Sequence, residues 1–278
     1  MIRGLYTGAS GMLSQMLKMD VVANNLANID KTGFKTDITV FKAFPEMLIR
    51  RINDDGVRKF PLGSYDKMPI VGRIGTGVEL NEVYTNFQQG SLKQTNNPFD
   101  FAIEGEGFFV IETERGIRYT RNGSFLIDKD NYLVTKDGYK VLGERGYIRV
   151  QGNNFVVNEK GEIIVNQDLY HRQIVSNIEN DWAGSTVIDR FKIVTFRELR
   201  ELKKEGNSFY YETEYSGKPQ APKNMPKIRQ GFIEQANVNI VKEMINMIEV
   251  QRAYEANSKS VTSHDMALAK LINDMARV

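Results

Sequence analysis

The sequence predicts an α+β fold, in which N- and C-terminal α-helices form a coiled-coil-like pair and the centre of the chain is a mostly antiparallel β domain. Apolar residues recur every seven positions at both ends of the 278-residue chain, which is typical of helices that pack along a seam. Short apolar runs between turn signals fill the middle, as in antiparallel sheets. None of the seven prolines falls within either terminal pattern, so neither helix is expected to break.

The N-terminal helix is predicted from a heptad pattern that begins at Ile2. Its a and d positions stay apolar for about four heptads. Thr32-Gly33 is expected to end the helix, because glycine is favoured just past a helix C-terminus. A single chain would bury little of this seam, so we expect it to pack against other subunits. The residues of this N-terminal seam are Ile2, Leu5, Ala9, Met12, Met16, Met19, Ala23 and Leu26.

Three asparagines interrupt the apolar stretch "VVANNLANIDKTGFK" at 21–35. Asn24, Asn25 and Asn28 occupy the b, c and f positions, away from the seam. A polar helix face is usually solvated. In a polymer it would instead meet other subunits, where primary amides both donate and accept hydrogen bonds. The sequence therefore predicts a polar inter-subunit face at these three residues.

Residues 36–75 predict an extended excursion with hairpin character. The part of it from residue 47 onward contains strand-like pieces, glycine-containing turns and two prolines. The run "GRIGTG" at 72–77 resembles a glycine-rich phosphate loop. We interpret it as a turn, because no strand-then-helix context surrounds it and no Gly-Lys-Ser/Thr follows.

Residues 76–217 predict a β-rich outer domain, either a sandwich or a barrel-like sheet. Apolar runs such as "FFVI" at 108–111 and "EIIV" at 162–165 alternate with turn signals every eight to twelve residues. Asn122-Gly123 and Asp137-Gly138 are expected to form tight hairpin turns, because both dipeptides tolerate positive φ.

Residues 218–231 contain Pro219, Pro222 and Pro226 and predict an extended linker. A second heptad pattern follows, with polar residues in its centre that would help to fix register. We expect residues 1–35 and 232–278 to form one discontinuous helical core domain; the alternative is an amphipathic helix packed on its own domain. The C-terminal seam consists of Ile240, Met244, Met247, Tyr254, Val261, Leu268 and Ile272.

Composition and motifs give no indication of an enzyme or of a cofactor. The chain has no cysteine, and its two histidines, His171 and His264, lack a paired ligand at metal-binding spacing. A net charge of +2 does not suggest nucleic-acid binding. No apolar run reaches the roughly 18 residues that a membrane span needs, and the N-terminus lacks the pattern of a cleaved signal peptide.

Four blocks, in order, resemble the bacterial flagellar basal-body rod and hook proteins. They are "SGM" with "MDVVANNLANIDKTGFK" (10–12, 19–35), "QQGSLKQTNNPFDFAIEGEGFFVI" (88–111), "YTRNGSFLID" with "YLVTKDGYKVLG" (119–128, 132–143) and "IRQGFIEQANVNIVKEMINMIEVQRAYEANSKSV" (228–261). The resemblance spans nearly the whole chain. It implies a structural, torque-transmitting subunit of the rod.

The resemblance also implies partners and a location. Family members pass through the flagellar export apparatus without a cleaved signal and assemble in the periplasm as a helical tube. Their terminal helices form the inner layer, and their partners are copies of themselves, other rod and hook axial proteins and, in some positions, the surrounding ring bushing. A short element from Phe44 to Leu48 resembles an export-gate motif; Phe34 to Ile38 fits the same pattern.

Tyr6, where distal-rod members commonly have tryptophan, and the unusual stretch 41–56 favour a proximal-rod member over a distal one. Two alternatives come from other classes of protein. One is a cell-wall hydrolase built on the β domain, which would need a carboxylate pair in a cleft. The other is a soluble binding module whose helices pack on its own domain.

Overall fold

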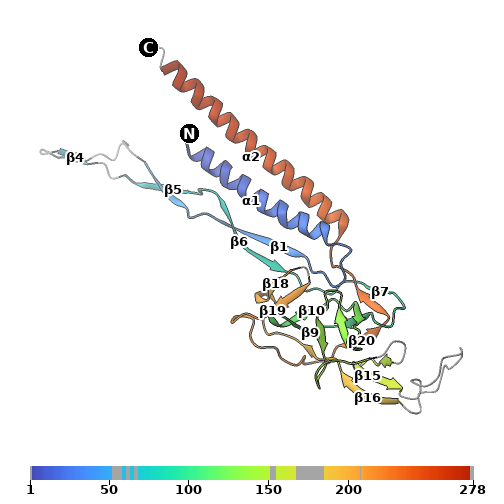
Figure 1. Cartoon of the computed structure of the whole chain (residues 1–278). Coiled ribbons are helices and arrows are strands. Elements are labelled where there is room, and N and C mark those ends of the chain that lie inside the picture. The colour runs from blue at the N-terminus through green and yellow to red at the C-terminus, as the bar shows by residue number, and fades with distance from the viewer. Residues whose placement is uncertain are drawn as a thin grey trace. The chain divides into compact units, whose positions relative to one another are not determined.

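The computed structural model describes residues 2–51, 58–60, 63–65, 68–150, 155–166, 185–206 and 208–275. The chain folds into two compact units. The helical unit contains Met1–Asn24, Asp37–Tyr84 and Val241–Val278, and the β unit contains Asn25–Thr36 and Thr85–Ile240. The predicted α+β class is confirmed, with a helix at each end of the chain and antiparallel strand pairs between them (Figure 1).

The two helices lie side by side and run antiparallel (Figure 1). They are α1 (Ile2–Ala27) and α2 (Ile240–Met275). The sequence placed the end of α1 at Gly33, which is wrong by several residues. Gly33 has a φ of +69°, and a Cβ there would lie 2.5 Å from the carbonyl carbon of Arg121. This glycine therefore permits a close approach of two backbones within the β unit rather than a helix stop.

The excursion predicted at 36–75 folds as successive strand pairs in the helical unit. Strands β2 and β5 are antiparallel partners, as are β3 and β4, and β1 pairs with β6. The strands are β1 (Asp37–Ala43), β2 (Met47–Arg50), β3 (Arg58–Phe60), β4 (Gly63–Tyr65), β5 (Ile70–Ile74) and β6 (Val78–Thr85).

The β unit is built around one large antiparallel sheet. Its strand order is β11-β12-β13-β9-β10-β19-β18, and β17 also pairs with β9. These strands are β9 (Phe108–Thr113), β10 (Gly116–Thr120), β11 (Phe125–Ile127), β12 (Leu133–Thr135), β13 (Lys140–Leu142), β17 (Ile193–Val194), β18 (Lys203–Glu205) and β19 (Phe209–Tyr211), with the 3-10 helix η2 (Leu199–Glu201) before β18.

Smaller strand sets complete the β unit. One sheet has the order β14-β15-β16, β20 pairs with β8, and β21 pairs with β7. The strands are β7 (Leu92–Gln94), β8 (Phe101–Glu104), β14 (Phe155–Val157), β15 (Glu162–Asn166), β16 (Ser185–Arg190), β20 (Lys227–Gln230) and β21 (Phe232–Glu234). Because β20 lies inside 218–231, the predicted proline linker is interrupted by a paired strand.

Alternating residues of β9 supply the two hydrophobic cores of the β unit. Phe109 and Ile111 belong to the larger core, and Phe108 and Val110 belong to the smaller one. This is the expected result of the two-residue period of a strand that is buried on both faces. The run "FFVI" is therefore continuous and apolar because each of its side chains enters a core.

Of the two predicted hairpin turns, one is confirmed and the other is wrong. Asp137-Gly138 joins the antiparallel neighbours β12 and β13, and Gly138 has a φ of +85°. Asn122-Gly123 instead links β10 to β11, which are not partners. A Cβ at Gly123 would lie 1.8 Å from the carbonyl oxygen of Phe101. Close backbone approach, and not turn geometry, requires this glycine.

Tyr119 makes the stability of the β unit depend on pH under alkaline conditions. It is buried in the smaller core, and its hydroxyl donates to Glu212 at 3.4 Å. Burial, together with that carboxylate, raises the pKa of Tyr119 from 10.0 to about 12. Since the folded-state pKa is the higher one, the stabilisation is complete below pH 10 and is lost as the pH rises through about 12.

We therefore expect Tyr119→Phe to remove a late-titrating tyrosine from the ultraviolet titration of the native protein. The same substitution should make the free energy of unfolding less dependent on pH above the ordinary tyrosine pKa. Tyr215, which is exposed, supplies the matched control through Tyr215→Phe. A late ionisation that persists in Tyr119→Phe would contradict this account.

Candidate assembly site and its junction

Three glycines of α1 form the face that contacts α2. A Cβ on Gly4 would lie 2.6 Å from Nε2 of His264, and one on Gly8 would lie 2.8 Å from Cγ2 of Val261. A Cβ on Gly11 would lie 2.8 Å from Nδ2 of Asn257. The absence of side chains at this glycine face (Gly4, Gly8 and Gly11) is therefore what allows the two helices to approach so closely. The glycines are spaced by four and three residues, which places them on one side of a helix; this signal is present in the sequence, but a heptad pattern of apolar residues does not include it.

A second face of α1 is apolar and exposed. Tyr6, Leu13 and Met16 are 66%, 55% and 45% exposed, and Ala9 between them is also exposed. At about 100° per residue these four side chains point away from the glycine face. We call them the outer stripe of α1. A row of exposed apolar side chains on a helix indicates a surface that another molecule covers.

The residues of the predicted N-terminal seam differ in burial. Its a positions Ala9, Met16 and Ala23 are exposed, whereas its d positions Leu5, Met12, Met19 and Leu26 are half-buried. The side chain of Ile2 lies outside the described residues. The a and d positions lie about 60° apart around the helix, so the two rows of side chains have different surroundings. Packing of the seam against other subunits stays a prediction.

The C-terminal seam lies partly on the α2 face that contacts α1. Val261 touches Gly8, and Met247, Tyr254 and Leu268 are half-buried. Ile240, Met244 and Ile272 are exposed. This seam therefore contributes to the contact within the chain and also leaves apolar surface free at each end of α2.

The predicted polar inter-subunit face is reduced to one residue. Asn24 is exposed, but Asn25 and Asn28 are buried within the chain. Both buried residues belong to the segment Asn25–Thr36, which is part of the β unit. Asn25 lies in the last turn of α1 and Asn28 follows directly after the helix. Because both amides are buried within the chain, neither lies on an outer face of the helix.

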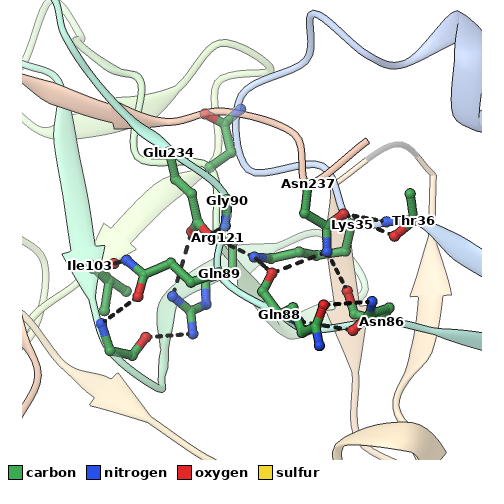
Figure 2. Close-up of polar contacts among 12 residues, drawn as sticks. Lys35, Thr36, Asn86, Gln88, Gln89, Gly90, Ile103, Arg121, Glu234 and Asn237 are labelled. Atoms are coloured by element: carbon green, nitrogen blue, oxygen red, sulfur yellow. Dashed lines mark hydrogen bonds and ion pairs between the residues drawn. The ribbon is translucent and has the colours of Figure 1, made fainter. Parts of the chain in front are cut away.

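A buried ion pair joins two distant segments of the β unit (Figure 2). Nζ of Lys35 lies 2.6 Å from Oε1 of Glu234, and the two side chains are 0% and 1% exposed. The same Nζ donates to the carbonyl oxygen of Gln88 at 2.8 Å, and the N–H of Gly90 donates to Oε1 of Glu234 at 2.9 Å. Hydrogen bonds of this kind are what make a buried charge tolerable.

Arg121 approaches the same carboxylate from the turn after β10. Its NH1 lies 3.5 Å from Oε2 of Glu234, and its NH2 donates to the carbonyl oxygen of Gly105 at 2.8 Å. The guanidinium also lies over the ring of Phe108, 5.4 Å from the centroid. Two buried cations therefore share one buried anion. Burial lowers the pKa of both Lys35 and Arg121, and Glu234 opposes that effect on each.

The amide of Asn237 ties three backbone segments together beside this ion pair (Figure 2). Its Oδ1 accepts from the N–H of Thr36 at 2.8 Å, and its Nδ2 donates to the carbonyl oxygens of Asn86 at 2.8 Å and Gln88 at 3.0 Å. The N–H of Asn86 in turn donates to the carbonyl oxygen of Thr36. A primary amide can do this because it is both donor and acceptor.

This network lies where the chain enters and leaves the β unit. The chain passes between units after residues 24, 36, 84 and 240. Thr36, Asn86 and Asn237 lie within three residues of three of these passages. We call the network the junction; it comprises Lys35, Thr36, Asn86, Gln88, Arg121, Glu234 and Asn237.

The remaining sequence predictions concern chemistry and export. Among the described residues, no three His, Asp or Glu side chains gather closely enough to hold a metal ion. His264 packs against Gly4, and His171 lies outside the described residues. Phe44 and Leu48 are exposed, whereas Phe34, in the alternative export motif, is buried. No helix in the described part of the chain is long and apolar enough to cross a membrane.

Three protein-family models match the chain in sequence order. "Flagella basal body rod protein" matches residues 5–35, "Flagellar hook protein FlgE/F/G D1 domain" matches 102–171, and "Flagellar basal body rod FlgEFG protein C-terminal" matches 229–274. The first contains most of α1 and the Lys35 segment, and the third contains Glu234 and nearly all of α2.

Curated relatives match over almost their full lengths. The chain is 34% identical to the flagellar basal-body rod protein FlgG of Borreliella burgdorferi, and the match covers 100% of both chains. It is 32% identical to FlgG of Bacillus subtilis over 98% of this chain and 99% of that protein. It is 31% identical to the flagellar basal-body rod protein FlgF of Caulobacter vibrioides over 93% of this chain and 92% of that protein.

Proposed function

The chain belongs to the flagellar basal-body rod protein family, and from that membership we propose that it is an FlgG-type rod subunit that polymerises through its helices and transmits torque through its junction. Family membership makes it a structural subunit that assembles with other rod and hook proteins, so the cell-wall hydrolase alternative is set aside. The observation that carries the proposal is the pair of faces on α1. One face is filled by α2, and the other is apolar and exposed.

Polymerisation would follow from burial of the outer stripe. A fully buried Leu or Met side chain contributes about 1.5–3 kcal/mol relative to an exposed one, and each subunit of a helical polymer repeats the contact. Before assembly, α1 packs against α2 and against the segment around Val78, where Ser14 donates to the carbonyl oxygen of Val78 at 3.1 Å. Much of both helices is still exposed, and helices with little to pack against are marginal in water. Assembly would therefore order and stabilise both helices, and methionine at Met16 suits a contact between non-identical neighbours.

Torque transmission would use the junction. A rod subunit under load must resist relative movement of the segments that connect its two units. The junction joins three of those segments by hydrogen bonds and a buried ion pair. Directional polar contacts of this kind fix one arrangement more strictly than apolar packing does.

The proposal also covers the position of the subunit within the rod and the route by which it is exported. The relatives named FlgG, matched over full length, support the FlgG type. The proximal rod favoured by Tyr6 and the distal rod are distinguished by locating a labelled subunit within purified basal bodies. We further propose passage through the flagellar export apparatus with Phe44 and Leu48 as a recognition element, periplasmic assembly, and contact with a ring bushing.

Met16→Asp tests the polymerisation directly. It places a carboxylate in the outer stripe, where burial in a subunit contact would be costly, while the β unit should keep its fold. We expect purified Met16→Asp to stay monomeric at concentrations at which the wild type scatters light as polymers, and to fail to restore motility. Met16→Leu should behave as the wild type does. Rods built normally by Met16→Asp, or a wild type that stays monomeric as a soluble binding module would, contradict the proposal.

A further inference from the structure

Helix α2 is longer than its partner and continues past it. Helix α1 has 26 residues and α2 has 36. Gly4 of α1 contacts His264 of α2, and α1 begins only two residues earlier, at Ile2. Helix α2 continues eleven residues beyond His264, to Met275. Its last turns therefore extend past the described N-terminal end of α1, as Figure 1 shows.

The α2 face that contacts α1 continues into these last turns. Asn257, Val261 and His264 contact the glycine face of α1, and Leu268, Leu271 and Met275 follow them at intervals of three and four residues. At about 100° per residue these positions form one stripe. Leu271, Ile272 and Met275 are 41%, 63% and 72% exposed. The stripe thus becomes more apolar where α1 no longer covers it. We call this part of the helix the α2 overhang; it consists of Leu268, Leu271, Ile272 and Met275.

We propose that the α2 overhang binds the outer stripe of α1 in a second copy of this chain. The overhang continues an intrachain helix–helix contact, so a helix is its natural occupant. The glycine face of a second α1 is already filled by its own α2, which leaves the outer stripe. The overhang from Leu268 to Met275 is about 10 Å long and the stripe from Tyr6 to Met16 is about 15 Å long, at about 1.5 Å per residue. The outer stripe is therefore long enough to receive the whole overhang, and both surfaces are apolar.

This inference rests on the proposed polymerisation and adds a direction to it. Within one subunit the overhang lies at the end of the helix pair where α1 begins. A contact from that end to the outer stripe of another copy is head-to-tail, and it repeats without closing unless rotation brings it back to the start. The overhang would thereby make the contact that lengthens the polymer.

Leu271→Asp tests the contact, and Asn273→Asp is its control. Asn273 lies on the opposite side of the same turn, so it receives the same carboxylate away from the stripe. We expect Leu271→Asp to raise the concentration needed for polymerisation at least about tenfold, which corresponds to loss of about 1.4 kcal/mol per contact. Asn273→Asp should polymerise as the wild type does. Equal effects of the two substitutions, or none from Leu271→Asp, would overturn the proposal.

Cysteine cross-linking identifies the occupant, because the chain has no cysteine of its own. Chains with Met16→Cys are mixed with chains carrying Leu271→Cys, polymerised and oxidised. A disulfide-linked dimer of the two variants is expected, and replacing Leu271→Cys by Asn273→Cys should remove most of it. Polymers that form without this dimer overturn the overhang contact but leave the proposed function standing. A wild-type chain that never polymerises overturns both.

Discussion

Replacing Glu234 by glutamine is expected to lower the free energy of unfolding of the β unit by about 3–5 kcal/mol, the usual cost of removing one partner from a buried ion pair. Glu234 is the carboxylate that faces both Lys35 and Arg121. Glutamine keeps the size of the side chain and leaves two buried cations without an anion. Differential scanning calorimetry of the purified chain should show a fall of roughly 6–20 °C in the midpoint, at about 2–4 °C per kcal/mol for a unit of this size.

Glu104→Gln is the matched control for Glu234→Gln. Glu104 accepts from Nε of Arg229 at 2.7 Å, but the two side chains are 41% and 46% exposed. An exposed pair contributes about 0–1 kcal/mol, so the control should unfold near the wild-type midpoint. A double-mutant cycle with Lys35→Met measures the coupling to Glu234 alone. Equal midpoints for Glu234→Gln and Glu104→Gln would show that the junction does not hold the β unit together.

Replacing Gly8 by leucine is expected to separate α1 from α2 and to abolish polymerisation. Gly8 is buried, and even a Cβ there would lie 2.8 Å from Cγ2 of Val261. Leucine is a better helix former than glycine by about 0.8–1 kcal/mol, so α1 on its own would gain stability. A loss of assembly would therefore report the contact between helices, because the substitution favours the helix itself. Sedimentation of the polymerised fraction is the measurement.

A compensating pair makes the Gly8 prediction specific. Gly8→Ala should impair polymerisation less than leucine does, because overpacking by one methyl costs about 1–3 kcal/mol. Val261→Ala removes the methyl that the new Cβ meets. The double variant should therefore polymerise better than Gly8→Ala alone. If Val261→Ala gives no rescue and Gly8→Leu still assembles, the glycine face is not the contact between the helices.

The terminal helices and many of the strands could be predicted because their signals are local. The heptad patterns predicted α1 and α2, and the dipeptide Asp137-Gly138 predicted the turn between β12 and β13. Asn122-Gly123 has the same local pattern. Its glycine is required instead because the backbone carbonyl of Phe101, more than twenty residues earlier, leaves no room for a Cβ. A dipeptide cannot reveal which distant backbone lies against it.

The junction could not be predicted, because its partners are far apart in sequence. Lys35 and Glu234 are separated by 199 positions, so the sequence around either residue does not identify its partner. Nothing local distinguishes a buried lysine from an exposed one. The asparagines show the converse case. The heptad pattern places Asn25 and Asn28 on an outer face, whereas both side chains are buried within the chain, the first in the last turn of α1 and the second just beyond it. The glycine face could have been recognised in the sequence from the spacing of Gly4, Gly8 and Gly11. A heptad pattern considers only apolar side chains at the a and d positions, so it does not register glycine.

We propose that subunits join through the outer stripe of α1. A cryo-electron-microscopy map of polymers of the wild-type chain, resolved to side chains, tests it most directly. We expect Tyr6, Leu13 and Met16 to lie against a helix of another subunit, while Gly4, Gly8 and Gly11 lie against α2 of their own subunit. A map in which the outer stripe faces solvent and the β units make the contacts between subunits would contradict it.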